Sequence, residues 1–273
     1  MVFIQGVGLH GDGWLPQTQT LVSHFRCVTF DNRGMGNSQP AGGDITVERM
    51  AEDALAVMDA EGIGSAHLVG QSLGGAVAMQ VALAARHRVG SLSLLCTSAR
   101  GSDATKLTAR MFWLGLRSRV GTRRMRSGAF LQIVMPAEYL ATQKRDELAE
   151  RLRPLFGHDL GDTPTITMRQ LSALRRFDAT ARLHELAGMP TLVLSAAHDL
   201  IFPPACGRGL AAGIPGARFV EMADAAHGVT IQSAEAVNGL LLEHFSADWS
   251  PRRSIDDACG PGKGRAINLL PTS

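Results

Sequence analysis

The chain has 273 residues, which is enough for one large α/β domain or two small ones. Hydrophobic residues make up 45% of it and charged residues 19%, a balance typical of globular proteins and not of disordered ones. The net charge of +2 gives no case for a nucleic-acid partner. No apolar run approaches the ~20 residues of a bilayer-spanning helix, and the N-terminus lacks signal-peptide features. We therefore expect a cytoplasmic protein with no membrane partner.

Short apolar runs alternate with helical patterns along most of the chain. Helical periodicity covers Glu48–Glu61 and Gly75–Arg86. Continuously apolar runs are typical of buried parallel strands, so alternating β and α units predict a mostly parallel sheet with helices on both faces. The fold class is therefore α/β. The predicted strands are Val2–Gln5, Cys27–Phe30, His67–Val69, Ser91–Cys96, Thr191–Ser195 and Arg218–Glu221.

The alternation is interrupted at residues 100–183, where helical patterns such as Met111–Leu116 and Leu140–Leu155 replace strands. We interpret this insertion as a helical lid on a core formed by residues 1–99 and 184–246. Residues 247–273 predict an irregular C-terminal tail. The lid holds 16 Lys and Arg against 8 Asp and Glu, a net charge of +8. Either this is a solvated basic surface, or it faces the site and favours anionic substrates.

The most informative motif is Gly70-Gln71-Ser72-Leu73-Gly74, which matches the pattern GxSxG. It follows an apolar strand and precedes a helix rich in small residues, which is the setting that a nucleophilic serine on a sharp strand-to-helix turn requires. Bulk at the flanking positions would clash, hence the two glycines. The N-terminus of the following helix favours negative charge at the site. We predict Ser72 to be a nucleophile.

A serine hydroxyl needs a base, and the base needs an acid that orients it. His227 is the preferred base because it lies between the last predicted strand and a C-terminal helix, Ser233–Phe245. Asp199 is the preferred acid because it follows the strand Thr191–Ser195 at the carboxyl edge of the sheet. The chain order Ser72, Asp199, His227 is that of strand-turn-helix serine hydrolases. Competing candidates are Asp224 and Asp103 for the acid and His10, His67, His198 and His244 for the base.

The four cysteines, Cys27, Cys96, Cys206 and Cys259, show no metal-ligand or redox spacing. We interpret them as reduced and structural, and we expect neither a metal nor a cofactor.

With these residues in place the chain resembles the α/β-hydrolase superfamily, in its lid-bearing branch of esterases, enol-lactonases and carbon–carbon bond hydrolases. The resemblance runs from Val2 to about Phe245. It includes the loop Asp31–Ser38, similar to the family pattern D-x-R-G-x-G-x-S, and the stretch Ala196–Pro204, similar to the family's acid loop. The resemblance implies the same triad of Ser72, Asp199 and His227. Family members that dehalogenate or open epoxides carry aspartate as nucleophile, so Ser72 points to acyl transfer.

The resemblance also implies an oxyanion hole built from main-chain N–H groups. In the family this loop follows a His-Gly pair, and the matching pair here is Gln5-Gly6. Carrying the role over by position assigns the N–H groups of Val7 and Leu73. Such donors often provide the largest single catalytic contribution.

The resulting prediction is a serine carboxylic-ester hydrolase acting on a small-molecule ester. The alternatives are an enol-lactone or vinylogous diketone hydrolase and, from another class, a non-catalytic ligand receptor on the same fold. Candidate pocket residues are Trp14, Met111, Phe112, Trp113, Phe130 and Met135. The family's first two strands have no counterpart before Val2–Gln5, so Cys27–Phe30 should form a sheet edge. We expect that edge to support a homodimer, to be covered by the tail, or to remain solvated.

Overall fold

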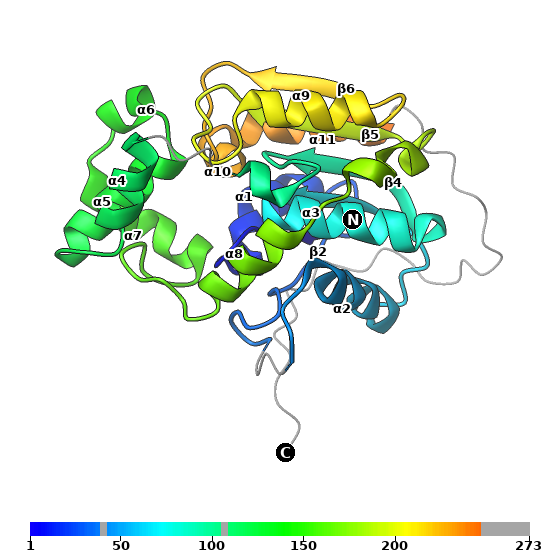
Figure 1. The fold of residues 1–273 in the computed structure, drawn as a ribbon, viewed down its shortest axis with the longest axis horizontal. Coiled ribbons are helices and arrows are strands. Elements are labelled where there is room, and N and C mark those ends of the chain that lie inside the picture. The colour runs from blue at the N-terminus through cyan, green and yellow to red at the C-terminus, as the bar shows by residue number, and fades with distance from the viewer. Residues whose placement is uncertain (39–42, 105–108, 247–273) are drawn as a thin grey trace.

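The computed structural model describes residues 1–38, 43–104 and 109–246, and Figure 1 shows a central sheet with helices on both faces. The strands are β1 (Val2–Ile4), β2 (Val28–Thr29), β3 (Ala66–Gln71), β4 (Val89–Leu95), β5 (Thr191–Ala196) and β6 (Arg218–Met222). The α-helices are α1 (Leu15–Leu21), α2 (Val47–Ala60), α3 (Leu73–Ala84), α4 (Ala109–Arg117), α5 (Arg123–Val134), α6 (Ala137–Ala141), α7 (Arg145–Phe156), α8 (Thr167–Arg176), α9 (Pro204–Gly213), α10 (Val229–Gln232) and α11 (Ala234–Ser246). Four 3₁₀ segments, η1 (Gly11–Trp14), η2 (Arg86–Arg88), η3 (Gly101–Asp103) and η4 (Thr180–Leu186), connect them.

All paired strands run parallel, in the order β2-β1-β3-β4-β5-β6. The predicted α/β architecture is therefore confirmed. The second strand lies at the edge, as expected, but it is shorter than predicted because only Val28 and Thr29 pair with β1. Just beyond it, the main chain of Phe30 passes so close to Gly11 of η1 that a Cβ on Gly11 would lie 3.0 Å from it.

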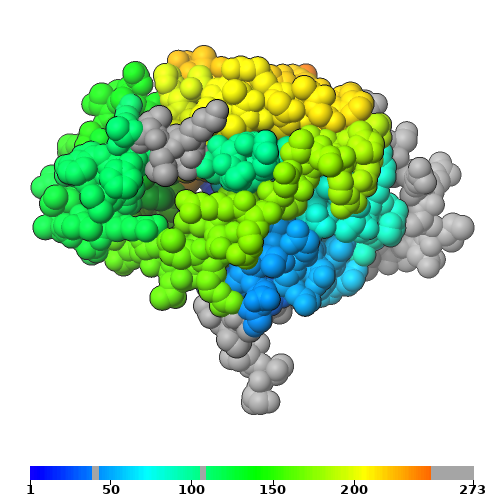
Figure 2. Space-filling view, viewed as in Figure 1, coloured from blue at the N-terminus to red at the C-terminus, as the bar shows by residue number. Residues whose placement is uncertain are grey.

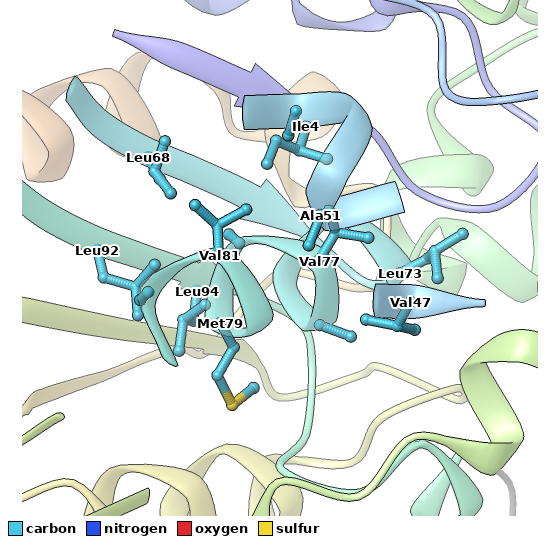
Figure 3. Packing of buried hydrophobic residues seen from close by; sticks show 14 of the residues in the cluster. Ile4, Val47, Ala51, Leu68, Leu73, Val77, Met79, Val81, Leu92 and Leu94 are labelled. Carbon is cyan, nitrogen blue, oxygen red and sulfur yellow. The ribbon is translucent and has the colours of Figure 1, made fainter. Parts of the chain in front are cut away.

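The sheet separates two apolar clusters. On one face α3 packs on the sheet with α2 beside it, and Figure 3 shows Val81 of α3 directed toward Leu68 and Val77 lying near Ala51 of α2. A helix that is apolar on all sides belongs in such a position. On the other face α1 and α11 cover a second cluster that includes Phe3 and Phe245. Both layers hold the sheet in place, so the ends of its strands form a rigid platform.

Five helices, α4 to α8, occupy the insertion between β4 and β5, and Figure 1 shows α4–α7 as a separate green lobe. That lobe has its own apolar cluster around Leu131, Leu148 and Phe156. The predicted helix Leu140–Leu155 is wrong in one respect, because it is two helices, α6 and α7, interrupted at residues 142–144. Thr142 donates its hydroxyl to the Tyr139 carbonyl, which satisfies the end of α6 locally and stops the helix.

Much of the positive charge of the lid lies in ion pairs on its surface. Arg123 pairs with Asp159 and Arg124 with Asp146. Exposed pairs of this kind contribute little to stability, about 0–1 kcal/mol. This arrangement favours a solvated basic surface. Within the described ranges no helix combines the length and apolar character that crossing a bilayer requires.

His67, near the start of β3, is a buried titratable group. Its Nδ1 lies 2.8 Å from the Ser91 hydroxyl, and its ring stacks on Phe245 at 4.8 Å. Burial lowers the pKa of His67 to about 4, with smaller contributions from the N-terminal ammonium group and His244. The folded protein therefore keeps this imidazole neutral at pH values where the unfolded chain protonates it.

Because the pKa of His67 is lower in the folded protein than in the unfolded chain, lowering the pH should reduce the free energy of unfolding. Between pH ~6.5, the ordinary histidine value, and about 4, the unfolded chain binds a proton at His67 that the folded protein does not. The stabilisation is complete above pH ~6.5 and is lost as the pH falls through this window. Thermal unfolding at a series of pH values should show a shallower decline of Tm for His67→Phe. An equal decline in both proteins would contradict this, and His87→Phe, at an exposed site, is the matched control.

Candidate active site

Ser72 lies at the turn between β3 and α3 with backbone angles that non-glycine residues rarely adopt, φ 55° and ψ −117°. Its N–H donates to the Leu95 carbonyl at 2.9 Å, and the Thr97 hydroxyl donates to its carbonyl at 2.8 Å. These bonds to β4 and the segment after it hold the strained peptide in place. A backbone of this kind persists only when its surroundings determine it, and it directs the serine side chain away from the sheet.

The two glycines of the motif are required by close approach. A Cβ on Gly70 would collide with the Gly74 carbonyl, and a Cβ on Gly74 would collide with the Ile4 carbonyl. The turn is therefore so tight that β3, the start of α3 and the end of β1 are in main-chain contact. The N-terminus of α3, with Leu73 as its first residue, points at the turn.

His227 and Asp199, 28 residues apart, are joined directly. The Nδ1 of His227 lies 2.8 Å from Oδ2 of Asp199, and the Asp199 side chain is fully buried. The other carboxylate oxygen accepts the N–H groups of Ile201 and Phe202 at 2.7 and 2.9 Å. Such bonds stabilise a carboxylate, and a carboxylate in this position fixes the imidazole with Nε2 free to act as a base.

Gln71, the residue directly before Ser72, connects the serine turn to the loop that carries His227. Its Nε2 donates to the His227 carbonyl at 2.6 Å, and its Oε1 accepts the Thr230 hydroxyl at 3.1 Å. Gln17 in turn donates to the Thr230 carbonyl at 2.6 Å. Sequence reasoning missed this role, although a polar residue between Gly70 and Ser72 at the end of a buried strand is an available signal.

Cys96, which sequence reasoning treated only as a small hydrophobe, lies against the same carboxylate. It has a positive φ of 47° and is fully buried. Burial raises the pKa of the Cys96 thiol well above its usual value, and the adjacent Asp199 raises it further. Ligand atoms of Cys96, Asp199 and His227 lie within 4.8 Å of one another. The Asp199 carboxylate and the His227 imidazole already bond to each other, and Cys96 adds a buried thiol beside this pair.

The loop after β1 passes beside the serine. A Cβ built on Gly6 would lie 3.5 Å from the Cβ of Ser72, which is an ordinary contact distance. Gln5, at the family's histidine position, is buried, and its Oε1 accepts the N–H of Gly6 at 2.8 Å. Asn32 donates to the Gln5 carbonyl at 2.7 Å. Gln5 therefore holds this turn through its side chain, at the position where the family has a histidine. Val7 follows Gly6 in the same turn.

The competing acids lie elsewhere. Asp224 is exposed, and Asp103 accepts the Ser98 hydroxyl and pairs with Arg100. Among the histidines, His10 lies 3.9 Å from Asp31, and His198 is exposed. Neither acid occupies the position that Asp199 has beside His227.

The candidate pocket residues are distributed unevenly. Trp14 does not fit the prediction, because it is fully buried and packs on Phe3 at 5.3 Å in the core under the sheet. Met135 lies beside Gly228, next to His227, and Phe130 packs on Phe156 inside the lid. Met111 is half-buried against the lid cluster. Phe112 and Trp113 are 62% and 55% exposed, and Trp113 stacks under Arg117. Figure 2 shows the surface hollowed where the lid meets the body.

Comparison with known proteins gives a consistent result. The family model described as alpha/beta hydrolase fold matches residues 1–234. A protein of Klebsiella pneumoniae (strain 342) named putative carbamate hydrolase RutD is 31% identical over 258 residues, which cover 93% of this chain and 94% of that protein.

Solved structures match over a similar range. The enol-lactonase from Burkholderia xenovorans LB400 is 28% identical, with a TM-score of 0.71 and coverage of 90% of both chains. A thermophilic esterase from Thermogutta terrifontis is 27% identical, with a TM-score of 0.72 and coverage of 90% of this chain and 88% of that one.

Replacing Gln71 by leucine should disturb the histidine loop without touching the hydroxyl of Ser72. The variant leaves the buried His227 carbonyl and Thr230 hydroxyl without this partner, and a small displacement of a catalytic group lowers rates by about 10- to 100-fold. We expect kcat for an activated ester to fall in that range while KM changes less. Gln19→Leu, at an exposed site, is the matched control. An unchanged kcat for Gln71→Leu would mean that the loop is held by other contacts.

Proposed function

This chain belongs to the α/β-hydrolase fold family, and we propose that it is a serine hydrolase that cleaves a carboxylic ester through an acyl-enzyme on Ser72. The observation that carries the proposal is the 2.8 Å bond between His227 and the buried Asp199, on a loop bonded by Gln71 to the serine turn. The strained backbone at Ser72 supports it independently. A serine held in a strained turn together with a histidine oriented by a buried carboxylate favours a catalyst over a ligand receptor.

The roles follow from the order of the contacts. Ser72 attacks the ester carbonyl while Nε2 of His227 accepts its proton, and Asp199 stabilises the resulting imidazolium. The main-chain N–H groups of Val7 and Leu73 stabilise the negative charge that develops on the carbonyl oxygen. His227 then protonates the leaving alcohol. Water repeats the same steps on the acyl-enzyme, which releases the acid and restores Ser72.

Two other substrate classes have a specific observation behind them. Relatives about 31% identical carry the name putative carbamate hydrolase, and a solved structure at 28% identity is an enol-lactonase. Carbamates, lactones and esters all present a carbonyl carbon with a departing heteroatom, so the same residues would serve each. A vinylogous diketone differs because its leaving group is a carbon, and a ligand receptor differs because nothing leaves.

A substrate panel separates these interpretations. A short p-nitrophenyl ester, a p-nitrophenyl carbamate, an enol-lactone and a ring-cleavage diketone are compared by kcat/KM. We expect the ester to be turned over best. A higher kcat/KM for one of the others would overturn the ester assignment and retain the serine mechanism. Binding of all four without turnover would instead support the receptor.

Ser72→Ala should lower kcat by a factor on the order of 10⁴–10⁶, because the nucleophile is lost while the fold is unaffected. Ester hydrolysis by the purified variant is the measurement, with circular dichroism as the check on folding. Ser65→Ala, at an exposed serine, should retain full activity. Retention of a tenth of the wild-type rate by Ser72→Ala would exclude Ser72 as the nucleophile.

A further inference from the structure

The lid reaches into the loop that carries the oxyanion position. His158 follows α7 directly in the lid, and its Nε2 lies 2.9 Å from the Gly8 carbonyl. Its Nδ1 lies 2.8 Å from the Asp159 carbonyl. Both neighbours are carbonyl oxygens, which only accept, and a neutral imidazole carries a single N–H, so the bond to Gly8 uses the tautomer with the proton on Nε2. His158 therefore links two main-chain segments that are 150 residues apart.

A second side chain from the insertion accepts a hydrogen bond from the N–H group of Gly8. Oε1 of Gln170, on α8, accepts the Gly8 N–H at 2.8 Å, and its Nε2 donates to the Arg33 carbonyl at 3.2 Å. Gln170 is fully buried. Both polar groups of the Gly8 backbone are thus bonded to side chains from the inserted region.

Gly8 is also constrained by its own conformation. Its φ is +71°, and a Cβ at this position would approach the Thr167 hydroxyl to 3.0 Å. It directly follows Val7, whose N–H is the proposed oxyanion donor. The Gly8 N–H lies in the Val7–Gly8 peptide plane and the Gly8 carbonyl in the next plane, so Gln170 and His158 hold the two planes that flank Gly8. The Val7 N–H lies in the preceding plane, one pair of backbone rotations away, and fixing the plane on the other side of Val7 limits how far that N–H can turn.

The side-chain hydrogen bonds that hold the start of this loop do not reach Val7. Gln5 bonds to the N–H of Gly6 and Asn32 to the Gln5 carbonyl, and both contacts end before Val7. Beyond Gly8, the N–H of His10 donates to the Phe156 carbonyl of α7 at 3.4 Å. The backbone bonds that tie Gly8 and His10 to other segments thus come from the insertion, and at Gly11 the body holds the chain again, because Asp31 accepts the Gly11 N–H at 2.8 Å.

We propose that His158 and Gln170 are positioning residues that fix the oxyanion loop from the lid side. This inference rests on the proposed serine-hydrolase function and adds that the insertion completes the oxyanion site as well as covering it. His158 acts on the transition state through Gly8 and Val7 and touches no substrate atom. Its loss should lower kcat more than it raises KM, because an oxyanion donor is engaged most strongly in the transition state.

The variants are His158→Leu, His158→Gln and Gln170→Leu. Removal of one oxyanion donor costs about 10²–10³ in kcat, and a displaced donor should cost part of that, about 10- to 100-fold. We expect His158→Leu to lose that much in kcat for a short p-nitrophenyl ester with less than a threefold change in KM. His158→Gln retains a side-chain N–H donor and should recover most of the rate. His184→Leu, at an exposed histidine, is the matched control.

Rates are normalised to active sites by labelling Ser72 with a fluorophosphonate, followed by intact-mass measurement, so that unfolded protein does not count. Affinity for a boronic acid that mimics the tetrahedral intermediate is the second readout. We expect His158→Leu to lose about as much affinity for the boronic acid as it loses in kcat. A purely structural role would lower Tm while leaving the normalised kcat and boronic acid affinity at wild-type values, which would overturn the inference.

The same labelling distinguishes the two levels of the proposal. If wild-type Ser72 is labelled and His158→Leu keeps its normalised kcat, only the positioning role is overturned. If wild-type Ser72 is not labelled, the serine mechanism is wrong and the positioning role is overturned with it. Both levels are supported if His158→Leu keeps the wild-type KM and loses kcat, while His158→Gln keeps most of the wild-type kcat.

Discussion

The strained peptide at Ser72 is the constraint on which the rest of the site depends. A positive φ at a serine needs neighbours that hold it, and here they are the Leu95 carbonyl, the Thr97 hydroxyl and the packed backbones of Gly74 and Ile4. The contact between Gly74 and Ile4 has a further consequence. It brings the end of β1 against the serine turn, so the loop from Gln5 onward must pass beside Ser72. The tight turn at Ser72 and the adjacent loop with the proposed oxyanion donor Val7 are thus one packing arrangement.

The parallel sheet brings the other residues of the site to the same place. Ser72 follows β3, Cys96 follows β4, Asp199 follows β5 and His227 follows β6, so all four loops leave the same edge of the sheet. The β5–β6 pairing brings the Asp199 and His227 loops together, and the N–H groups of Ala197 and His198 bond to the Met222 and Ala225 carbonyls. Asp199 and His227 meet because neighbouring parallel strands end together. The main-chain bonds to Asp199 and the bridge made by Gln71 then hold the two loops in position.

Elements with strong periodicity were predictable from the sequence, and those set by distant contacts were not. The six strands and the buried helix α3 follow from apolar runs, and the candidates Ser72, Asp199 and His227 follow from motif and strand-end position. The placement of Trp14 failed because an aromatic residue near a site motif has the same pattern whether it faces the pocket or the core. The division of Leu140–Leu155 into two helices depends on Thr142, whose capping bond has no periodic signature. Gln71 and His158 depend on partners 150 or more residues away, which spacing along the chain does not reveal.

The lid contacts the catalytic loops through main-chain groups as well as apolar packing. The Gly228 N–H, next to His227, donates to the Val134 carbonyl at the end of α5 at 2.7 Å, and Leu9, Leu200 and Ile231 join the apolar cluster of the lid. The loops that carry His227, Asp199 and the proposed oxyanion donor Val7 therefore each have a contact with the insertion. Substitutions that reshape the lid for a new substrate would act on these loops as well. The parts of the lid free to change without that effect are those away from these contacts, such as the exposed face of α4 with Phe112 and Trp113. In this arrangement substrate choice and catalytic geometry are separable only within part of the lid.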